Sequence, residues 1–242
     1  MPALPYLVSM KKLLQAILPA LVLSTSPAVA GDNVVLVELF TSQGCSSCPP
    51  ADANLGALTG RDDVLPLSMH VDYWDYLGWR DTFAKSEHSQ RQYAYRTMMG
   101  ARVVYTPQMI VHGVADVPGY RTALIEQAID EAGARKRDAD IVIAAKDGML
   151  AAKITTEGRP MPCTIWVASY DREATVDIRR GENAGETITY HNVVEKLMRV
   201  GRWPGSNSQT IDLPQPGAGE GVAVWLQDDR TGRILAASFI EG

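Results

Sequence analysis

The order of apolar and polar residues differs between the two halves of the chain. Residues 34–40 form an almost continuous apolar run rich in β-branched side chains, which is typical of a strand buried on both faces. Strand-type runs and helical spacing of apolar residues then alternate along the first half. Further strands are expected at 64–71 and at 103–111, the latter entered across Thr106-Pro107, and helices at 51–59, 81–99 and 120–132. This alternation predicts an α/β domain with a parallel or mixed sheet.

The second half contains short strand patterns separated by Gly, Pro and Asp turns. The expected strands lie at 141–145, 149–155, 164–168, 175–178, 222–226 and 234–239. Such a series predicts a β-sandwich of about 100 residues. We place the domain boundary between residues 135 and 136, so that residues 31–135 form the α/β domain and 136–242 form an all-β, sandwich-like domain.

The first 30 residues have the pattern of a secretory signal peptide. Lys11 and Lys12 precede a short apolar run at 13–23, and Ala28-Val29-Ala30 is a small-x-small cleavage site. A membrane-spanning helix needs about 20 apolar residues, and no later run reaches that length. We therefore expect a mature chain without a membrane span, located in the periplasm or secreted, where disulfides persist.

The composition is that of a folded globular protein. Of the 242 residues, 46% are hydrophobic and 21% are charged, which excludes a disordered chain. The formal net charge is −5, and the basic run at 135–137 is followed at once by acidic residues. Nucleic-acid binding requires clustered Lys and Arg side chains, so we expect no nucleic-acid partner.

The candidate chemistry lies in the sequence Cys-Ser-Ser-Cys at 45–48, between an expected strand and an expected helix. The free N–H groups and the dipole at a helix N-terminus stabilise an anion such as the Cys45 thiolate. The thiolate attacks a substrate, and Cys48 then resolves the mixed disulfide from the next turn. The pattern favours a thiol–disulfide oxidoreductase that acts on protein thiols or disulfides and needs no dissociable cofactor.

Other interpretations of the two cysteines stay open. They can form a structural disulfide in a non-catalytic binding protein. A metal site would need additional ligands, and the chain has no second cysteine pair, so we assign no metal ligand. A copper-handling protein that uses Cys45, Cys48 and His70 is a further alternative. Cys163 lies far along the chain and is expected to be a buried apolar residue.

Four short segments together resemble the thioredoxin superfamily. They are Val-Glu-Leu-Phe at 37–40, Cys-Ser-Ser-Cys at 45–48, His-Val-Asp at 70–72 and Tyr-Thr-Pro at 105–107. More closely, the run from Glu38 to Asp52 and the later segments 180–185 and 190–194 resemble the DUF1223 family, secreted bacterial proteins of unknown function. The resemblance implies a thioredoxin-like α/β fold for the first domain. It also implies that Pro107 is cis and faces the cysteines, and that the backbone of Thr106 pairs with an extended substrate.

Two further residues are candidates for the site. Glu38 is an acid inside an apolar strand, where burial of an ionised carboxylate is costly. The thioredoxin resemblance implies that such an acid takes a proton from the resolving thiol, so we expect Glu38 to act as a base for Cys48; a structural polar contact is the alternative. Trp74 belongs to an aromatic cluster at 73–79, which forms either a wall that selects substrate or a packing contact.

Overall fold

The computed structural model describes Met1 and residues 34–146, 149–156 and 161–242. The predicted signal peptide lies, apart from Met1, outside the described residues. Those residues form three α-helices, a short 3₁₀ helix and eleven strands. The elements of the first half are β1 Val35–Thr41, α1 Pro49–Leu58, β2 Val64–His70, η1 Asp75–Leu77, α2 Ser86–Met98, β3 Gln108–Val111, β4 Ala115–Pro118 and α3 Thr122–Gly133.

Strands make up the second half. They are β5 Ala139–Lys146, β6 Met149–Thr156, β7 Cys163–Asp177, β8 Thr187–Trp203, β9 Gln209–Leu213, β10 Glu220–Gln227 and β11 Ile234–Glu241. The strand expected at 103–111 begins only at Gln108, and α2 begins five residues later than the pattern predicted. Neither β8 nor β9 was predicted. Strand β8 carries Glu195, Lys196 and Arg199 among its apolar residues, so its sequence does not stand out as a buried strand.

One sheet joins strands from both halves of the chain. Its eight strands run in the order β11-β10-β7-β8-β2-β1-β3-β4. Strand β1 pairs in parallel with β2 and antiparallel with β3, and β2 pairs in parallel with β8 at Ser68 and Val193. Strands β5, β6 and β9 form a second, three-stranded sheet.

The predicted fold class is therefore wrong. The structure is mostly β, with 44% strand and 19% helix, and is not a thioredoxin-like α/β domain followed by a β-sandwich. The boundary expected at residues 135 and 136 falls between α3 and β5, yet strands on both sides of it share the large sheet. The physical reason is that β2 is not the edge of a separate domain, because β8 lies beside it and pairs with it at Ser68 and Val193.

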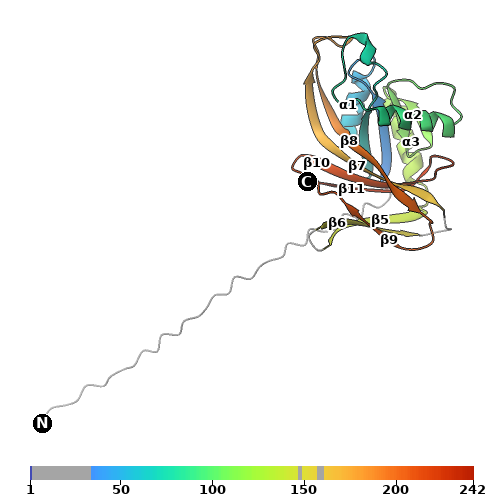
Figure 1. Cartoon of the computed structure of the whole chain (residues 1–242), viewed down its shortest axis with the longest axis vertical. Coiled ribbons are helices and arrows are strands. Elements are labelled where there is room, and N and C mark those ends of the chain that lie inside the picture. Colours follow the sequence, from blue (N-terminus) through green and yellow to red (C-terminus); the bar gives the residue numbers. More distant parts are fainter. Residues whose placement is uncertain (2–33, 147–148, 157–160) are drawn as a thin grey trace.

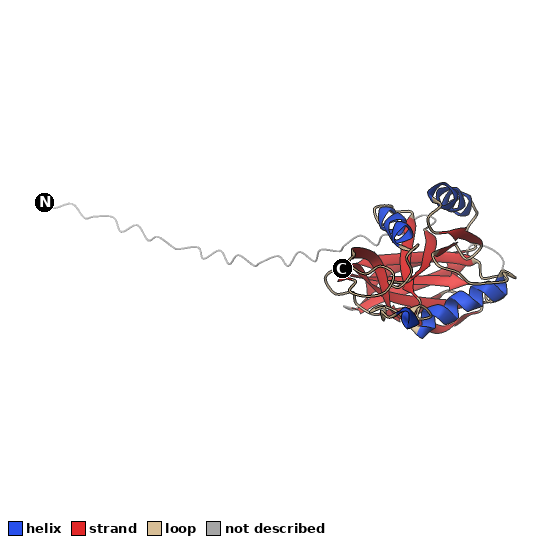
Figure 2. Cartoon of the chain, turned by 90° about the horizontal axis from the view of Figure 1, so that it is seen from above, coloured by secondary structure: helices blue, strands red, loops and turns tan. Residues whose placement is uncertain are grey.

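Helices cover both faces of the large sheet, as Figure 2 shows. Because side chains alternate along a strand, β1 sends Val37 and Leu39 towards α1 and α3, and sends Leu36 and Phe40 towards α2. A third apolar cluster packs the small sheet against β7, β10 and β11 (Figure 1). The strand that leads to the cysteines is thus fixed by packing on both sides.

A buried ion pair connects the two halves on the α2 side. Arg91 of α2 donates two hydrogen bonds to Glu38 of β1 and a third, 3.1 Å long, to Gln227 of β10. The Arg91 guanidinium also lies 4.8 Å from the ring centre of Trp166 and 5.2 Å from that of Trp225. Side chains of Arg91 and Glu38 are 4% and 0% exposed, so each charge depends on the other for compensation.

We predict that Arg91→Met lowers the free energy of unfolding by about 3–5 kcal/mol, because Glu38 is left charged and buried. Urea denaturation of the mature chain measures this loss. The control is Lys85→Ala, which removes an exposed pair with Glu195 and should cost less than about 1 kcal/mol. Equal losses in the two variants would contradict the importance given to the buried pair.

Candidate functional site

Cys45 and Cys48 form a disulfide where β1 passes into α1. The Cys48 N–H donates to the Cys45 carbonyl at 3.1 Å, and the helix then begins with two prolines, which need no hydrogen-bond acceptor in the first turn. The two cysteines are 2% and 0% exposed, while Ser46 and Ser47 between them are exposed. The sulfur atoms are therefore almost completely covered in this form.

Three of the predicted site residues gather beside Cys45. The Thr106 hydroxyl donates to Cys45 Sγ at 3.2 Å, and the indole N–H of Trp74 donates to the same hydroxyl at 2.8 Å. The Thr106–Pro107 peptide bond is cis. The structure thus places Thr106, Pro107 and Trp74 together although they are distant in sequence from Cys45.

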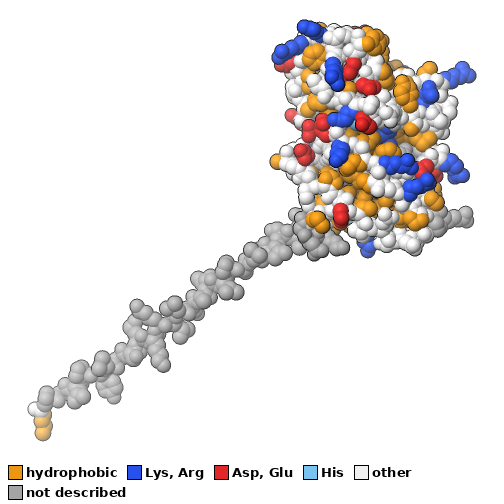
Figure 3. Space-filling view, viewed as in Figure 1, with side chains coloured by type: hydrophobic (Ala, Val, Ile, Leu, Met, Phe, Trp, Pro, Cys, Tyr) orange, Lys and Arg blue, Asp and Glu red, His pale blue; other side chains and the backbone are white. Residues whose placement is uncertain are grey.

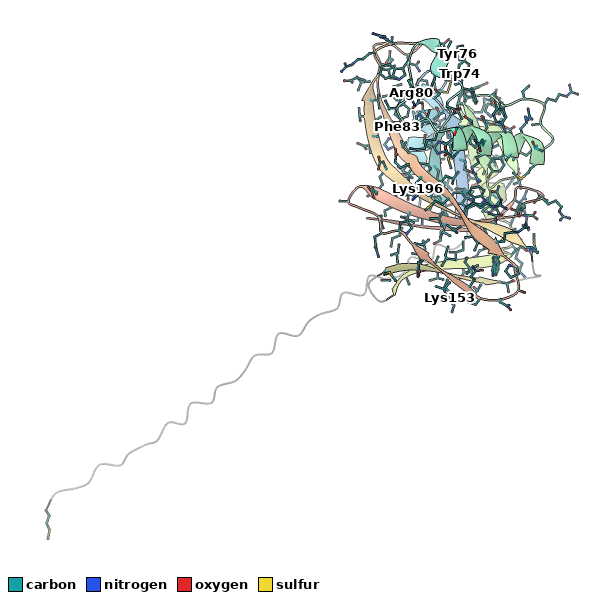
Figure 4. The ribbon with its side chains drawn as sticks, in the orientation of Figure 1. Trp74, Tyr76, Arg80, Phe83, Lys153 and Lys196 are labelled. Carbon is teal, nitrogen blue, oxygen red and sulfur yellow. A yellow bond between two sulfur atoms is a disulfide. The ribbon has the colours of Figure 1, made fainter. Side chains whose placement is uncertain are left out.

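The turn between β7 and β8, residues 178–186, covers the other side of Cys45; we refer to it as the hairpin tip. The Asn183 side-chain N–H₂ donates to the carbonyls of Gln43 and Cys45 at 2.9 and 3.0 Å. The Ser46 N–H donates to Glu182 at 3.2 Å. In Figures 1 and 4 the long hairpin extends to the end of the molecule where Trp74 and Tyr76 lie. In the sequence, segment 180–185 is notable only for its resemblance to DUF1223, and it was not predicted to lie at the site, since no local pattern indicates a contact across about 140 positions.

Asp52 is a buried acid in the first turn of α1, four residues after Cys48 and therefore next to it on the helix surface. It is 3% exposed, and neither carboxylate oxygen has a hydrogen-bond partner among the described residues. Burial raises the pKa of Asp52 to about 7, and the neighbouring His70 and Thr41 oppose this shift. A carboxyl group with this pKa exchanges a proton near neutral pH.

A histidine–aspartate pair lies beside Asp52. His70 Nδ1 is 2.7 Å from Asp81 Oδ2, and both side chains are fully buried. Although burial acts to raise the pKa of Asp81, the charge and hydrogen bond of His70 and the N–H groups of Gln43 and Phe83 lower it overall. His70 Nε2 has no partner among the described residues. Because the Gln43 N–H also binds Asp81, this pair is connected to the loop that carries Cys45.

Glu38 lies on the opposite side of the sheet from α1. Its carboxylate accepts hydrogen bonds from Arg91 and Tyr95, both of α2. Its position therefore favours the structural contact over the role of a base for Cys48. Asp52 could have been noticed in the sequence from its spacing to Cys48, but an acid in a first helical turn is also favourable simply because of the helix dipole.

Two further predictions concern a metal site and a membrane-spanning segment. Within residues 34–146, 149–156 and 161–242, no group of three or more His, Cys, Asp and Glu residues is arranged to hold a metal ion. The same part of the chain contains no helix that is long and apolar enough to cross a membrane. On the face in Figure 3, acidic and basic side chains are interspersed.

The comparisons with known proteins identify the family. The family model described as "Protein of unknown function (DUF1223)" matches residues 36–227, so the chain belongs to this family, as the sequence resemblance predicted. The structure is similar to the crystal structure of protein AGR_C_4864 from Agrobacterium tumefaciens, with 34% sequence identity and a TM-score of 0.73. That similarity covers 86% of this chain and 94% of the other. No curated protein matches the sequence.

We predict that Asp52→Asn changes how stability depends on pH. The folded chain keeps Asp52 protonated up to about pH 7, whereas the unfolded chain releases the proton near its ordinary pKa of 3.8. The wild type therefore loses stability relative to Asp52→Asn as the pH rises from about 4 to about 7, by roughly 4 kcal/mol in all. Urea denaturation at several pH values measures the difference.

The matched control for this measurement is Asp130→Asn, which changes an exposed acid. Its stability should follow that of the wild type at every pH. Parallel pH profiles for the wild type and Asp52→Asn would show that Asp52 does not retain its proton in the folded chain.

Proposed function

We propose that the protein is a thiol–disulfide oxidoreductase of the periplasm or cell exterior, with protein thiols or disulfides as substrates. The observation that carries the proposal is the hydrogen bond from the Thr106 hydroxyl to Cys45 Sγ. A purely structural disulfide needs no hydrogen-bond donor directed at its sulfur. A donor at this place, together with the N-terminal end of α1, stabilises the thiolate that forms when the disulfide is reduced.

The proposed reaction begins with the reduced protein. The Cys45 thiolate attacks one sulfur of a substrate disulfide, a bond forms between Cys45 and that sulfur, and the other substrate sulfur leaves and takes up a proton. Cys48 then loses its proton and attacks Cys45 Sγ, which re-forms the disulfide and releases the second substrate sulfur as a thiol. Two electrons pass from the dithiol to the substrate, and the reverse sequence oxidises a substrate dithiol.

We assign to Asp52 the role of accepting the proton of Cys48. It lies one turn further along the same helix, and a carboxyl with a pKa of about 7 can accept the proton at neutral pH and return it in the reverse direction. The buried pair of His70 and Asp81 acts on Asp52 in both directions, because His70 lowers the pKa of Asp52 and Asp81 raises it, so burial remains the main cause of the raised pKa.

The substrate side of the proposed site is formed by Trp74 and the Thr106–Pro107 segment. Tyr76 stacks on Trp74 with ring centres 6.4 Å apart, and Tyr76 is 77% exposed. These rings offer an apolar surface to a polypeptide whose cysteine reaches Cys45. The backbone of Thr106 is the candidate for pairing with that polypeptide.

A second candidate is a non-catalytic binding protein with a permanent disulfide. The 2% exposure of Cys45 favours this candidate, since a sulfur that is never uncovered cannot exchange. Catalysis requires Cys45 Sγ to become uncovered, and the two candidates differ in whether it does.

We predict that Cys45→Ser abolishes the reduction of insulin disulfides by the mature protein in the presence of dithiothreitol, because the attacking sulfur is lost. Insulin precipitation gives the rate. Cys163→Ser is the matched control: Cys163 is a free thiol, fully buried, and its loss should leave the rate unchanged. A wild-type rate no higher than that of Cys45→Ser would favour the non-catalytic candidate.

A further inference from the structure

The hairpin tip makes hydrogen bonds to the loop at Cys45 of the kinds that a polypeptide backbone makes. Asn183 supplies two N–H donors to backbone carbonyls, and Glu182 supplies an oxygen that accepts from a backbone N–H. An extended chain carries the same groups, N–H donors and carbonyl acceptors. The three backbone groups around Cys45 that such a chain would use are thus already occupied by the tip.

The tip is built to approach this loop closely. Gly181 has φ +80°, which favours glycine, and a Cβ added there would lie 3.1 Å from Trp79 Cβ, so the tip packs closely on Trp79, whose indole N–H donates to the Gln43 side chain of the loop. Hydrogen bonds within the turn, from Gly185 N–H to the Ile178 carbonyl and from Glu186 N–H to the Asn183 carbonyl, fix the shape that presents Asn183. Asn183 is 7% exposed, which indicates that it fills its site.

The tip can separate from the loop at Cys45 without breaking the sheet. Strand β10 pairs with β7 only as far as Asp171, and β2 pairs with β8 at Val193. Arg172 N–H still donates to the Gly219 carbonyl, and beyond it the strand residues 173–177 and 187–191 pair with each other as a two-stranded ribbon. The base of the ribbon is held against the body by Tyr190, which is 1% exposed and packs on His70 and Phe83, and by the Asn192 side chain, which donates to the Pro66 carbonyl. A two-stranded ribbon is weakly stabilised by itself, so its free end is the part that can move.

We propose that the hairpin tip holds the place of an extended polypeptide substrate, and that Asn183 and Glu182 restrict the disulfide to flexible polypeptide segments that can replace them. In the occupied state, the backbone N–H groups of the segment donate to the carbonyls of Gln43 and Cys45, and a carbonyl of the segment accepts from the Ser46 N–H. This deepens the proposed function and rests on it, since it names the substrate class of the same site.

The test compares two reductants of the Cys45–Cys48 disulfide in the whole mature chain. One is dithiothreitol, and the other is a flexible ten-residue peptide with two cysteines. In each case a thiolate of the reductant attacks Cys45 Sγ, the Cys45–Cys48 bond breaks, and Cys48 leaves and takes up a proton. The second thiol of the reductant then releases Cys45 and becomes oxidised. Alkylation followed by mass spectrometry measures the rate.

Asn183→Ala removes two hydrogen bonds, so the peptide should react about tenfold faster or more. The rate with dithiothreitol should rise less, because only the peptide gains the two freed carbonyls. Glu182→Ala should act in the same direction with a smaller effect. Glu186→Ala is the matched control, an exposed acid on the same tip that should change neither rate.

Unchanged peptide rates in both Asn183→Ala and Glu182→Ala would overturn the proposal, as would equal increases for peptide and dithiothreitol. If Asn183→Ala does not fold, Glu182→Ala decides, because Glu182 is exposed. Failure of this proposal can be told apart from failure of the proposed function. If the wild type does not reduce insulin but Asn183→Ala still accelerates the peptide more than dithiothreitol, catalysis is rejected. The proposal that the tip occupies the position of a polypeptide then stands.

Discussion

The pairing of β2 with β8 is the constraint on which the rest of the structure depends. It continues one sheet from the first half of the chain into the second, and it places the β7–β8 hairpin beside β2. The hairpin is long enough to reach past the end of β1, where the cysteines lie. Without this junction, Cys45 would have Thr106 and Trp74 on one side and solvent on the other.

Two buried acids on opposite faces of the sheet have different surroundings and therefore different roles. Glu38 is neutralised by Arg91 and fixes α2 to strands from both halves. Asp52 has no cation bonded to it and no hydrogen-bond partner among the described residues, so burial sets its pKa near 7. A fully compensated acid contributes to stability, whereas an uncompensated acid beside a cysteine is suited to proton exchange.

Local features of the sequence correctly predicted some of the strands and helices around the site. The strand before the cysteines, the helix after them and the strand at 64–71 follow from apolar patterns and from proline and glycine positions. Thr106 and Pro107 were predicted for the site through a resemblance to known proteins, and Trp74 through the aromatic cluster at 73–79. The joined sheet and the contact of Asn183 with the loop at Cys45 depend on pairing between distant strands, and a strand as polar as β8 gives no sign of its neighbour. Asp52 was close to Cys48 in the sequence, but its burial became visible only in the structure.

The reduction potential of the Cys45–Cys48 disulfide tests the central claim most directly. It is measured by equilibrating the mature chain with glutathione buffers of known ratio and determining the fraction reduced. A disulfide that is reduced and re-formed during catalysis has a reduction potential above about −300 mV, so that the glutathione buffers reduce a measurable fraction of it. A potential below about −300 mV, with the disulfide resistant to glutathione, would contradict the account and identify a structural disulfide.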